Sequence, residues 1–547
     1  MKFEVEAAAK EFLERETEFH LGFLPTEQSN PKTRNMEADF KRATADGVRT
    51  MQRPDRDVLA MAKRVLASEA FARMTADGIR TVRGGGRIVF SGCGSTGRLS
   101  ILLESMWREY YAEKGNPGRA DAAASIMTGG DFALVKSVEA FEDYSNFGRR
   151  QAADLEIGPA DMLVAITEGG ETSSVLGTVA EAAERGAKVY LLFNNPAELL
   201  RARLERSRKA IDDPRVTVQD LSCGPMALAG STRMQATTAE QLVAGAMLEG
   251  VIANLENLKP SDSVSGFEQV LDHLESEETV QMLAGFIDFE AKTYRNGGKL
   301  TYLVKDYLLD VFTDTTERAP TFMLPPFRSG DDADSPLSWA FVKNPLCPTR
   351  ETWSGMLHRA PRCLAWTRDD YRRMEAPQRL IDAPPAIDAE SLYRYEVGNE
   401  AAPERFDGAG SGAVLIEVAG GPGNGALENA ARNWKVVRTF AIASGAPDSP
   451  LHLMNHLALK LALNTVSTGT MARLGRVAGN WMSWVSISNK KLIDRSIRLI
   501  AELGGFSYRD ACFAFFDAVD AMEAEDWTGR EKPSPVQYTL ARLKTRI

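Results

Sequence analysis

Short apolar runs alternate with longer segments of helical periodicity between residues 87 and 257. Apolar runs bounded by turn residues are typical of buried strands, and apolar positions spaced three or four apart are typical of amphipathic helices. Strands that alternate with helices form a parallel sheet with helices on both faces. We therefore expect an α/β fold. The pattern predicts strands at 87–92, 122–130, 161–170, 187–196 and 215–221 and helices at 97–111, 131–143, 172–186 and 237–257.

The same pattern recurs, more weakly, in the second half of the chain. Residues 297–314 resemble residues 84–101, and residues 412–444 resemble residues 161–196. Repeated supersecondary units in one chain indicate a duplication, so we expect two αβα sandwiches that pair as an internal pseudo-dimer. The predicted division is an N-terminal helical and loop segment at 1–56, a first unit at 57–258, a second unit at 259–450, and a helical lid or C-terminal domain at 451–547.

The first predicted strand runs into the glycine-rich loop GCGSTGR, residues 92–98. Its G-x-G-x-x-G pattern is also that of dinucleotide-binding loops, in which an acidic residue about 20 positions later binds the ribose. Asp121 lies at that distance but precedes the second strand, at the wrong edge of the sheet. Hydroxyls at a helix N-terminus suit a phosphate monoester instead. We therefore expect Gly94, Ser95 and Thr96 to bind a phosphate.

Two further hydroxyl clusters stand where helices are expected to begin. Thr172 and Ser173 follow the third strand in TEGGETSS, and Ser231 and Thr232 precede the helix at 237–257 in GSTRM. One such cluster is usually a helix cap. Ligands of open parallel sheets bind at the carboxyl ends of the strands, so clusters gathered at this edge predict one binding site.

Five motifs together carry a family resemblance: TEQSNPKT (26–33), GCGSTGRL (92–99), TGGDFALVKSVEAFED (128–143), GPMALAGSTRM (224–234) and LNTVSTGTMARLGRVAGNWM (463–482). They resemble the bacterial N-acetylmuramic acid 6-phosphate etherases and the related glucokinase regulatory protein. The resemblance implies two SIS (sugar isomerase) domains of flavodoxin-like topology, followed by a helical lid. It also implies a sugar-phosphate ligand.

The resemblance assigns expected roles to individual residues. Ser95, Thr96, Thr167, Ser231 and Thr232 match positions that contact the phosphate or the sugar. Arg476 matches a lysine that reaches the ligand from the lid. Glu142 matches a catalytic acid/base of the etherases and a sugar-contacting residue of the regulatory protein.

The chain departs from the etherase pattern at several positions. A second catalytic glutamate falls on Met106, and Glu104 is two residues out of register and would point elsewhere on the helix. Glu171 stands where the family has an arginine, so the third-strand loop is expected to face ligand hydroxyls. Gln235 replaces a family lysine and removes another positive charge.

The segment TDTTERAPTF (313–322) resembles the family sequence around the missing glutamate and places Glu317 in its position. The second unit has no hydroxyl loops, since LVKDYLL (303–309) and GGPGNG (420–425) stand in their places. We expect a composite site formed by the loops of the first unit, Glu317 of the second and Arg476 of the lid. In the alternative, Glu317 is a relic or a structural ion-pair partner.

The composition of the chain argues against several classes of binding partner. A net charge of −10 argues against nucleic acid, and no apolar run reaches membrane-spanning length. Five scattered cysteines and a charged N-terminus favour the cytoplasm. His452 and His456 are spaced i, i+4 but lack an intervening acid, so we expect a packed pair and no metal. A small sugar phosphate is the expected partner and no cofactor is expected; a further homodimer and a kinase partner stay open.

Three functions compete. The first is an enzyme that acts on a sugar 6-phosphate by proton transfer, through ether elimination or isomerisation, with Glu142 and Glu317 as catalytic residues. The second is a non-catalytic sugar-phosphate sensor, which the tandem layout and Met106 favour. The third is a nucleotide-dependent oxidoreductase, which the position of Asp121 disfavours.

Overall fold

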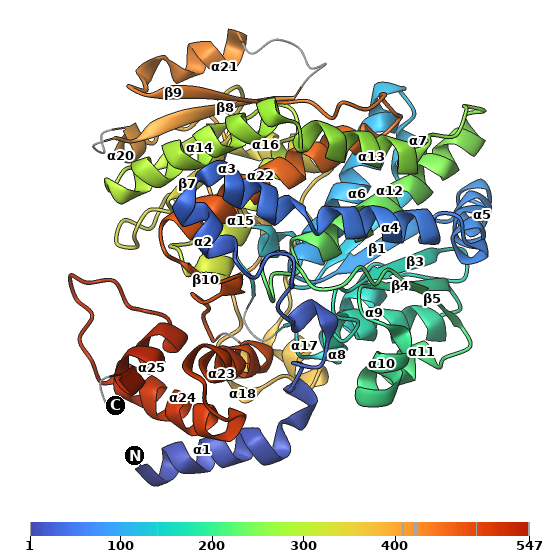
Figure 1. Cartoon of the computed structure of the whole chain (residues 1–547). Helices are drawn as coiled ribbons and strands as arrows, with labels where there is room; N and C mark the ends of the chain where they lie inside the picture. Colours follow the sequence, from blue (N-terminus) through green and yellow to red (C-terminus); the bar gives the residue numbers. More distant parts are fainter. Residues whose placement is uncertain (1, 139–140, 407–409, 419–424, 488, 545–547) are drawn as a thin grey trace.

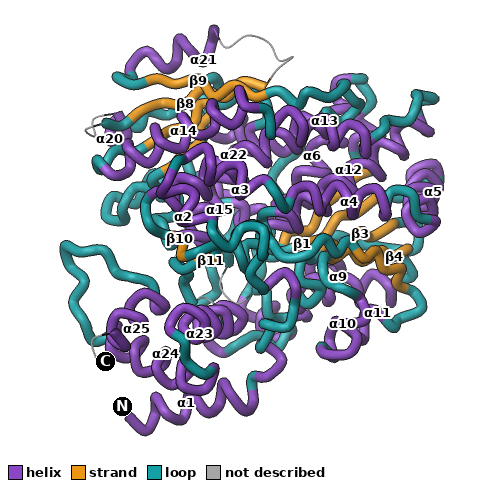
Figure 2. Tube along the Cα trace, in the orientation of Figure 1, coloured by secondary structure: helices purple, strands orange, loops and turns teal. Residues whose placement is uncertain are grey.

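The computed structural model describes residues 2–138, 141–406, 410–418, 425–487 and 489–544. Within these ranges the chain forms two larger sheets whose strands are all parallel (Figure 1). Helices separate the two sheets and cover their outer faces (Figure 2). The predicted α/β class is confirmed.

The first sheet contains each of the five predicted strands, in the order β2-β1-β3-β4-β5. β1, β2 and β3 are buried along their whole length. Their near-continuous apolar sequence follows from this burial, because helices cover both faces of the sheet. The strands are β1 Ile88–Gly92, β2 Ala123–Met127, β3 Met162–Ile166, β4 Lys188–Phe193 and β5 Val216–Asp220.

The helices around this sheet are α4 Asp55–Val65, α5 Glu69–Arg83, α6 Ser95–Glu113, α7 Pro117–Ala120, α8 Ser145–Asp154, α9 Ser173–Glu184, α10 Ala197–Arg203, α11 Glu205–Ile211 and α12 Gln235–Leu255. Of these, α6, α9 and α12 lie close to the predicted ranges 97–111, 172–186 and 237–257, whereas α7, α10 and α11 are missing from the prediction. α12 packs against α4, α5 and α6.

The helix predicted at 131–143 is wrong. Only a 3₁₀ turn, η3 Asp131–Leu134, forms there, and the next helix begins at Ser145. The Asp131 carboxylate accepts hydrogen bonds from the Arg362 backbone and the Arg359 side chain of the second unit. Phe141 packs in an aromatic cluster with Trp366. These tertiary contacts override the local helical pattern.

The second sheet has the order β7-β6-β8-β9, which repeats the order of the first sheet without its fifth strand. This shared order supports the predicted duplication. β7 is missing from the prediction because it is only four residues long and lies among polar loops. Of the GGPGNG loop, residues 420–424 lie outside the described residues. The strands are β6 Leu300–Leu303, β7 Ala340–Lys343, β8 Gly412–Val418 and β9 Val437–Ile442.

Two long helices, α15 and α22, form the centre of the second unit's helical packing. α15 follows β6 as α6 follows β1, and α22 packs against α12, α14 and α15. The helices of this unit are α13 Ser263–Leu274, α14 Glu277–Arg295, α15 Leu308–Phe322, α16 Thr349–Leu357, α17 Arg368–Arg373, α18 Gln378–Asp382, α19 Ala389–Tyr393, α20 Pro403–Phe406, α21 Gly425–Ala430, η4 Ala431–Asn433 and α22 Leu453–Arg473.

The two ends of the described chain meet in a separate group of helices. α1 packs against α24 beside α23 and α25 (Figure 1). α3 lies on α14 and α22 instead, so the first 56 residues touch both the lid and the second unit. The elements are α1 Lys2–Arg15, η1 Thr17–Phe19, η2 Pro25–Glu27, α2 Met36–Arg42, α3 Thr44–Gln52, β10 Val477–Ala478, β11 Trp481–Met482, α23 Lys490–Gly504, α24 Tyr508–Glu523 and α25 Pro535–Lys544.

The four-part division of the chain stays a prediction, because packing does not mark its boundaries. α22 begins just after residue 450 yet lies inside the second unit. None of the described helices is both long and apolar enough to cross a bilayer.

The turn between β1 and α6 leaves no space for a side chain at Gly92. A Cβ there would lie 2.3 Å from the backbone of Thr96. We expect Gly92→Ala to destabilise the protein by about 1–3 kcal/mol, because backbone cannot shift as a flexible side chain can. Thermal unfolding would measure the change.

Gly285 provides the matched control for Gly92→Ala. It lies in the interior of α14 with open space around its Cβ position. Gly285→Ala should leave stability unchanged or raise it, since alanine favours helix. Equal unfolding temperatures for the two variants would contradict the packing described for Gly92.

Candidate active site

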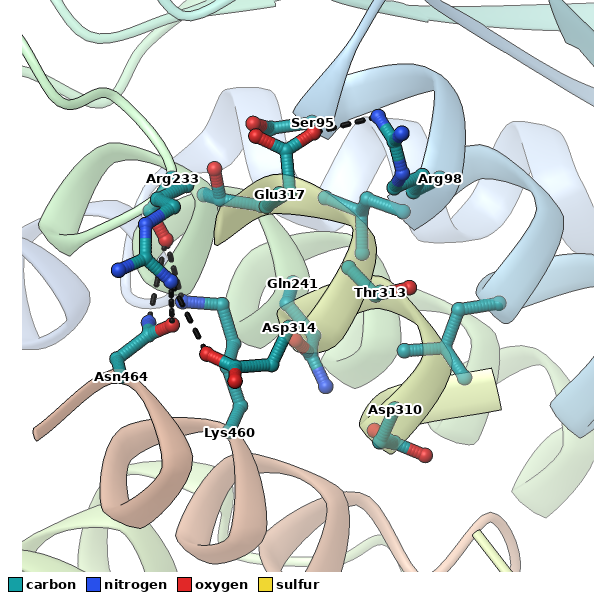
Figure 3. A pocket seen from close by; sticks show the side chains of 13 residues that line it. Ser95, Arg98, Arg233, Gln241, Asp310, Thr313, Asp314, Glu317, Lys460 and Asn464 are labelled. Carbon is teal, nitrogen blue, oxygen red and sulfur yellow. Dashed lines mark hydrogen bonds and ion pairs between the residues drawn. The ribbon is translucent and has the colours of Figure 1, made fainter. Parts of the chain in front are cut away.

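A narrow cavity lies between the two units, where α6, α12, α15 and α22 meet (Figure 3). We call it the first cavity. Both units contribute polar side chains to its wall, so it is a shared space rather than a pocket of one unit. Its lining includes Ser95, Arg98, Arg233, Thr237, Gln241, Asp310, Thr313, Asp314, Glu317, Lys460 and Asn464.

The glycine-rich loop places Ser95 at this cavity. Gly94 takes a left-handed conformation, with φ of 56°, and α6 begins at Ser95. The Thr96 hydroxyl turns back to the loop, where it donates to the Cys93 carbonyl oxygen and accepts from the Cys93 N–H, both at 2.9 Å. Ser95 therefore faces the cavity, while Thr96 fixes the turn.

Glu317 reaches the same cavity from the second unit. Its Oε1 lies 2.5 Å from Nη1 of Arg98, and both side chains are buried. Arg98 also donates to the Leu134 carbonyl oxygen at 3.0 Å. Glu317 is thus an ion-pair partner, as in the structural alternative, and it also lines a cavity together with Ser95. Ser95 and Glu317 of the predicted composite site therefore line one cavity, and the site itself stays a prediction.

Two basic side chains, the buried Arg233 and the partly buried Lys460, also line this cavity. Arg233 donates to Asp314 Oδ1 at 3.0 Å and to Asn464 Oδ1 at 3.1 Å. Lys460 donates to the Arg233 carbonyl oxygen at 3.0 Å and to Thr238 Oγ1 at 2.7 Å. Burial lowers the pKa of Lys460 to about 7, although Asp55 opposes the shift.

Several polar atoms of the cavity wall have no hydrogen-bond partner among the described residues. They are the amide nitrogen of Gln241, the hydroxyl of Thr313 and Nε of Arg233. Buried polar groups are nearly always paired. These three unpaired groups therefore line one cavity and are available for hydrogen bonds there.

A group of acidic side chains lies beside the glycine-rich loop. Burial raises the pKa of Glu142, and Glu171 and Asp143 add to the rise while Lys491 opposes it. Asn489 of the lid donates to Glu142 Oε2 at 3.3 Å. Glu142 also lies near enough to Cys93 to help burial raise the pKa of that thiol, so it adjoins the loop that carries Ser95.

Glu168 is a site residue that sequence reasoning missed. Burial raises its pKa to about 7, Lys491 opposes the shift, and Glu317 and Glu142 add to it. Glu168 therefore interacts with the carboxylates of both units. Its Oε1 is buried with no partner among the described residues. The available signal was an acidic residue directly after a buried strand, in ITEGG.

Lys491 is the cation that the lid presents to this group. Its Nζ lies 3.3 Å from Glu171 Oε1, and Arg206 lies 2.8 Å from Glu171 Oε2. Although Glu171 is buried, the two cations lower its pKa. These two cations therefore neutralise the negative charge of Glu171.

Arg476, expected to reach the ligand, lies elsewhere. Its guanidinium stacks on Trp484 at 4.2 Å and Trp339 at 4.9 Å and donates to the Phe322 carbonyl oxygen at 3.0 Å. An ion pair with Glu531 completes its contacts. These aromatic and carbonyl contacts fix Arg476 outside the first cavity.

The remaining predicted hydroxyls lie at the same edge of the first sheet. Thr167 is fully buried and donates to Thr172 Oγ1 at 3.0 Å. Ser173 begins α9. Ser231 is buried and Thr232 is partly buried in the loop that leads into α12. Thr167 and Thr172 therefore support the loop, and the structure leaves the ligand contacts of this set a prediction.

The departures from the family pattern have structural explanations. Glu104 is buried among Arg108, Arg359 and Arg362, away from the first cavity. Gln235 donates to Asp55 Oδ1 at 2.7 Å and accepts from a backbone N–H. Gln235 therefore holds the loop before α12 through neutral hydrogen bonds, whereas the family lysine would add a positive charge at this position.

His452 and His456 do not share a ligand. His452 Nδ1 lies 2.6 Å from Asp448, and His456 Nδ1 lies 2.9 Å from Asp310. No group of three or more histidine, cysteine or acidic side chains suited to a metal ion occurs among the described residues.

Comparisons with known proteins identify the relatives. Residues 70–183 match the glucokinase regulatory protein N-terminal SIS domain. The N-acetylmuramic acid 6-phosphate etherase of Yersinia pestis (strain Pestoides F) is 32% identical over 235 residues, which are 43% of this chain and 72% of that protein. The chain belongs to the N-acetylmuramic acid 6-phosphate etherase family.

Other members of this etherase family match over a similar length. The etherase 1 of Bacillus licheniformis is 29% identical over 224 residues, 41% of this chain and 67% of that protein. More than half of this chain lies outside either match. Among solved structures, the tagatose-6-phosphate ketose/aldose isomerase of Escherichia coli is 10% identical, over 80% of this chain and 95% of that chain, with a TM-score of 0.41, which is too low to support a conclusion.

The raised pKa of Glu168 predicts a pH-dependent stability. The folded protein holds the Glu168 proton more tightly than the unfolded chain, whose pKa is near 4.5. Wild-type stability should therefore fall relative to that of Glu168→Gln as the pH rises from about 4.5 to about 7, by about 3 kcal/mol in total. Urea unfolding at each pH would measure the difference.

The exposed Glu278 supplies the control for this pH series. Glu278→Gln should follow the wild type at every pH. Burial also raises the pKa of Asp55 to about 7, but its effect on stability is the same in all three proteins because each retains Asp55. A constant difference between wild type and Glu168→Gln would show that folding does not raise the pKa of Glu168 and would contradict the prediction.

Proposed function

We propose that this chain is an etherase-like lyase that acts on an amino-sugar 6-phosphate by glutamate-mediated proton transfer. The observation that carries the proposal is the meeting of Ser95 of the first unit and Glu317 of the second in one cavity. Relatives named as N-acetylmuramic acid 6-phosphate etherases support the substrate class.

The position of Met106 supports a single active site. α6 begins at the first cavity with Ser95, and Met106 further along it lines a different cavity beside α15. The missing glutamate therefore does not deprive the first cavity of a carboxylate. Glu317, which stands in the matching position of the second unit, supplies one instead.

The phosphate would bind at the first-unit loops. Ser95 and Ser173 begin helices α6 and α9, and helix N-termini favour anions. Lys491 adds a positive charge from the lid, because its ammonium remains protonated among the acidic groups around it. Ser231 and Thr232 are proposed as further contacts, while Arg476 takes no part.

The two glutamates suit different protonation roles. Burial raises the pKa of Glu142, which brings this carboxyl closer to the neutral range in which acid/base catalysts work. The guanidinium of Arg98 holds Glu317 in place. In the proposed elimination one carboxylate removes a proton from the carbon beside the sugar carbonyl. A carbon–carbon double bond forms as the ether carbon–oxygen bond breaks, and the other glutamate, as the carboxylic acid, protonates the leaving oxygen. An aldose–ketose isomerisation would use the same first step.

Entry of the substrate requires the lid to move. The first cavity has a volume of about 40 Å³, whereas ligand pockets span about 300–1,000 Å³. Asn489 and Lys491 of the lid contact Glu142 and Glu171. We propose that these two contacts break when the substrate enters, which would free Glu142 and the loop that carries Glu171.

We further propose a cytoplasmic location and no requirement for a cofactor. The oligomeric state and a kinase partner stay open. The tandem layout and Met106 keep the sensor as the alternative function.

Proton exchange in heavy water tests the catalytic roles. With N-acetylmuramic acid 6-phosphate, NMR should show deuterium incorporation at a sugar carbon together with the eliminated product. Glu142→Gln and Glu317→Gln should each lower this rate by about 10²-fold or more. Ser95→Ala should weaken binding, measured by calorimetry.

Glu278→Gln should keep the wild-type rate. Circular dichroism must show that Glu317→Gln is folded, because it leaves Arg98 without its carboxylate. Full exchange in Glu142→Gln would refute the assigned role. Tight binding by the wild type with neither exchange nor product would replace the enzyme with the sensor.

A further inference from the structure

A larger cavity lies on the second unit, next to the first cavity. We call it the second cavity; its lining includes Met106 and Glu113 of α6, Tyr307 of α15, His358 after α16 and His452 before α22. Its volume is about 850 Å³, within the range of small-molecule sites. Leu102 and Asp310 line both cavities.

The two cavities lie at equivalent positions of the two units: the first at the start of α6, the second at the start of α15. α6 begins at the first cavity and its later turns line the second. α15 does the reverse, since Leu308 lies at the second cavity and Glu317 at the first. The duplicated fold therefore retains two ligand positions, one at the carboxyl end of each central strand.

The loop before α15 lacks the hydroxyl residues that the glycine-rich loop before α6 offers to a phosphate. Where the first unit has Cys-Gly-Ser-Thr at 93–96, the second has Asp306, Tyr307, Leu308 and Leu309. Asp306 is exposed at the mouth of the cavity. A carboxylate in this position repels a phosphate, so the second cavity selects against the ligand proposed for the first.

The acidic side chains around the second cavity favour a positively charged ligand. Five acidic residues with exposed side chains stand around the mouth: Glu109, Glu113, Asp306, Glu351 and Asp448. Lys305 is the one lysine or arginine among the described lining residues. Burial lowers the pKa of His358, which keeps this imidazole neutral near pH 7. A concave surface with one sign of charge concentrates ligands of the opposite sign.

Three helix ends with unusual backbone conformation border the same cavity. Tyr307, His358 and His452 are left-handed, with φ of 61°, 49° and 49°. Residues other than glycine adopt this conformation at a cost of about 1 kcal/mol or more, and such strain gathers at functional sites. Three of the seven such residues in the described ranges line this one cavity.

The floor of the cavity is suited to an organic body rather than a bare ion. Leu102, Met106 and Met356 supply apolar surface, and the Tyr307 ring stands edge-on to His456 at 4.7 Å. No metal-binding group of acidic, histidine or cysteine side chains occurs in the described chain. An aromatic ring beside carboxylates is a favourable setting for an ammonium group.

We propose that the second cavity binds a small hydroxylated organic amine and excludes phosphate esters. The amine would interact with the acidic mouth, and the carbon skeleton would rest on the apolar floor. This site is distinct from the proposed active site and does not depend on its chemistry.

Glucosamine is a suitable probe, titrated into the full-length protein by calorimetry at low salt. The wild type should bind it, and N-acetylglucosamine and glucosamine 6-phosphate should each bind about tenfold more weakly at this cavity. Glu113→Gln/Glu351→Gln should weaken glucosamine binding by about tenfold, because both exposed mouth carboxylates are removed. Raising the salt concentration should also weaken binding.

Glu278→Gln/Glu523→Gln, which removes two exposed charges elsewhere, should bind glucosamine as the wild type does. Ser95→Ala should also leave it unchanged, which separates this site from the first cavity. The proposal is overturned if glucosamine does not bind, if N-acetylglucosamine binds equally well, or if Ser95→Ala rather than the mouth variant abolishes binding.

Discussion

The buried ion pair between Arg98 and Glu317 ties the two units together at the point where α6 crosses α15. Removing one partner of such a pair costs about 3–5 kcal/mol, because the other charge stays buried. The pair therefore fixes how far each helix extends past the other. Since each helix begins at one cavity and passes beside the other, this one contact sets the geometry of both.

Duplication followed by divergence explains why the two cavities differ. The first unit keeps the hydroxyl loops, and the second keeps the glutamate that faces them. The corresponding residues of the other half-site have been replaced in both units, by Met106 in α6 and by Asp306, Tyr307 and Leu308 at the start of α15. One chain thus concentrates the parts of a single site, which frees the second position for another ligand.

The lid depends on a second buried charge group. Glu27 pairs with Arg495 at 2.7 Å and with Arg498 at 2.8 Å. Burial opposes ionisation of Glu27, but the two guanidinium groups hold its pKa at about 2. The N-terminal segment therefore anchors α23, and α23 in turn carries Asn489 and Lys491 to the loops.

The sequence predicted the parts of the site that local patterns determine. Each strand of the first sheet and the loop with Ser95 follow from periodicity and glycine positions. Glu317 needed the family resemblance, since its own segment gives no sign that it crosses to the other unit.

The parts of the fold and of the site that the sequence did not predict depend on contacts between distant segments. The aromatic cluster around Phe141 prevents a helix at 131–143, and two tryptophans remove Arg476 from the site. Glu168 and Lys491 gain their importance from burial beside other charged groups, which no local sequence pattern reveals. Thr96 has the expected position, but its hydroxyl is already used within the turn.

A crystal structure of the full chain bound to N-acetylmuramic acid 6-phosphate would test the composite site most directly. The account predicts the phosphate at Ser95 and the start of α6, with the sugar ring between Glu142 of the first unit and Glu317 of the second. A ligand bound by first-unit loops alone, with Glu317 beyond contact, would contradict it, and so would a phosphate in the second cavity.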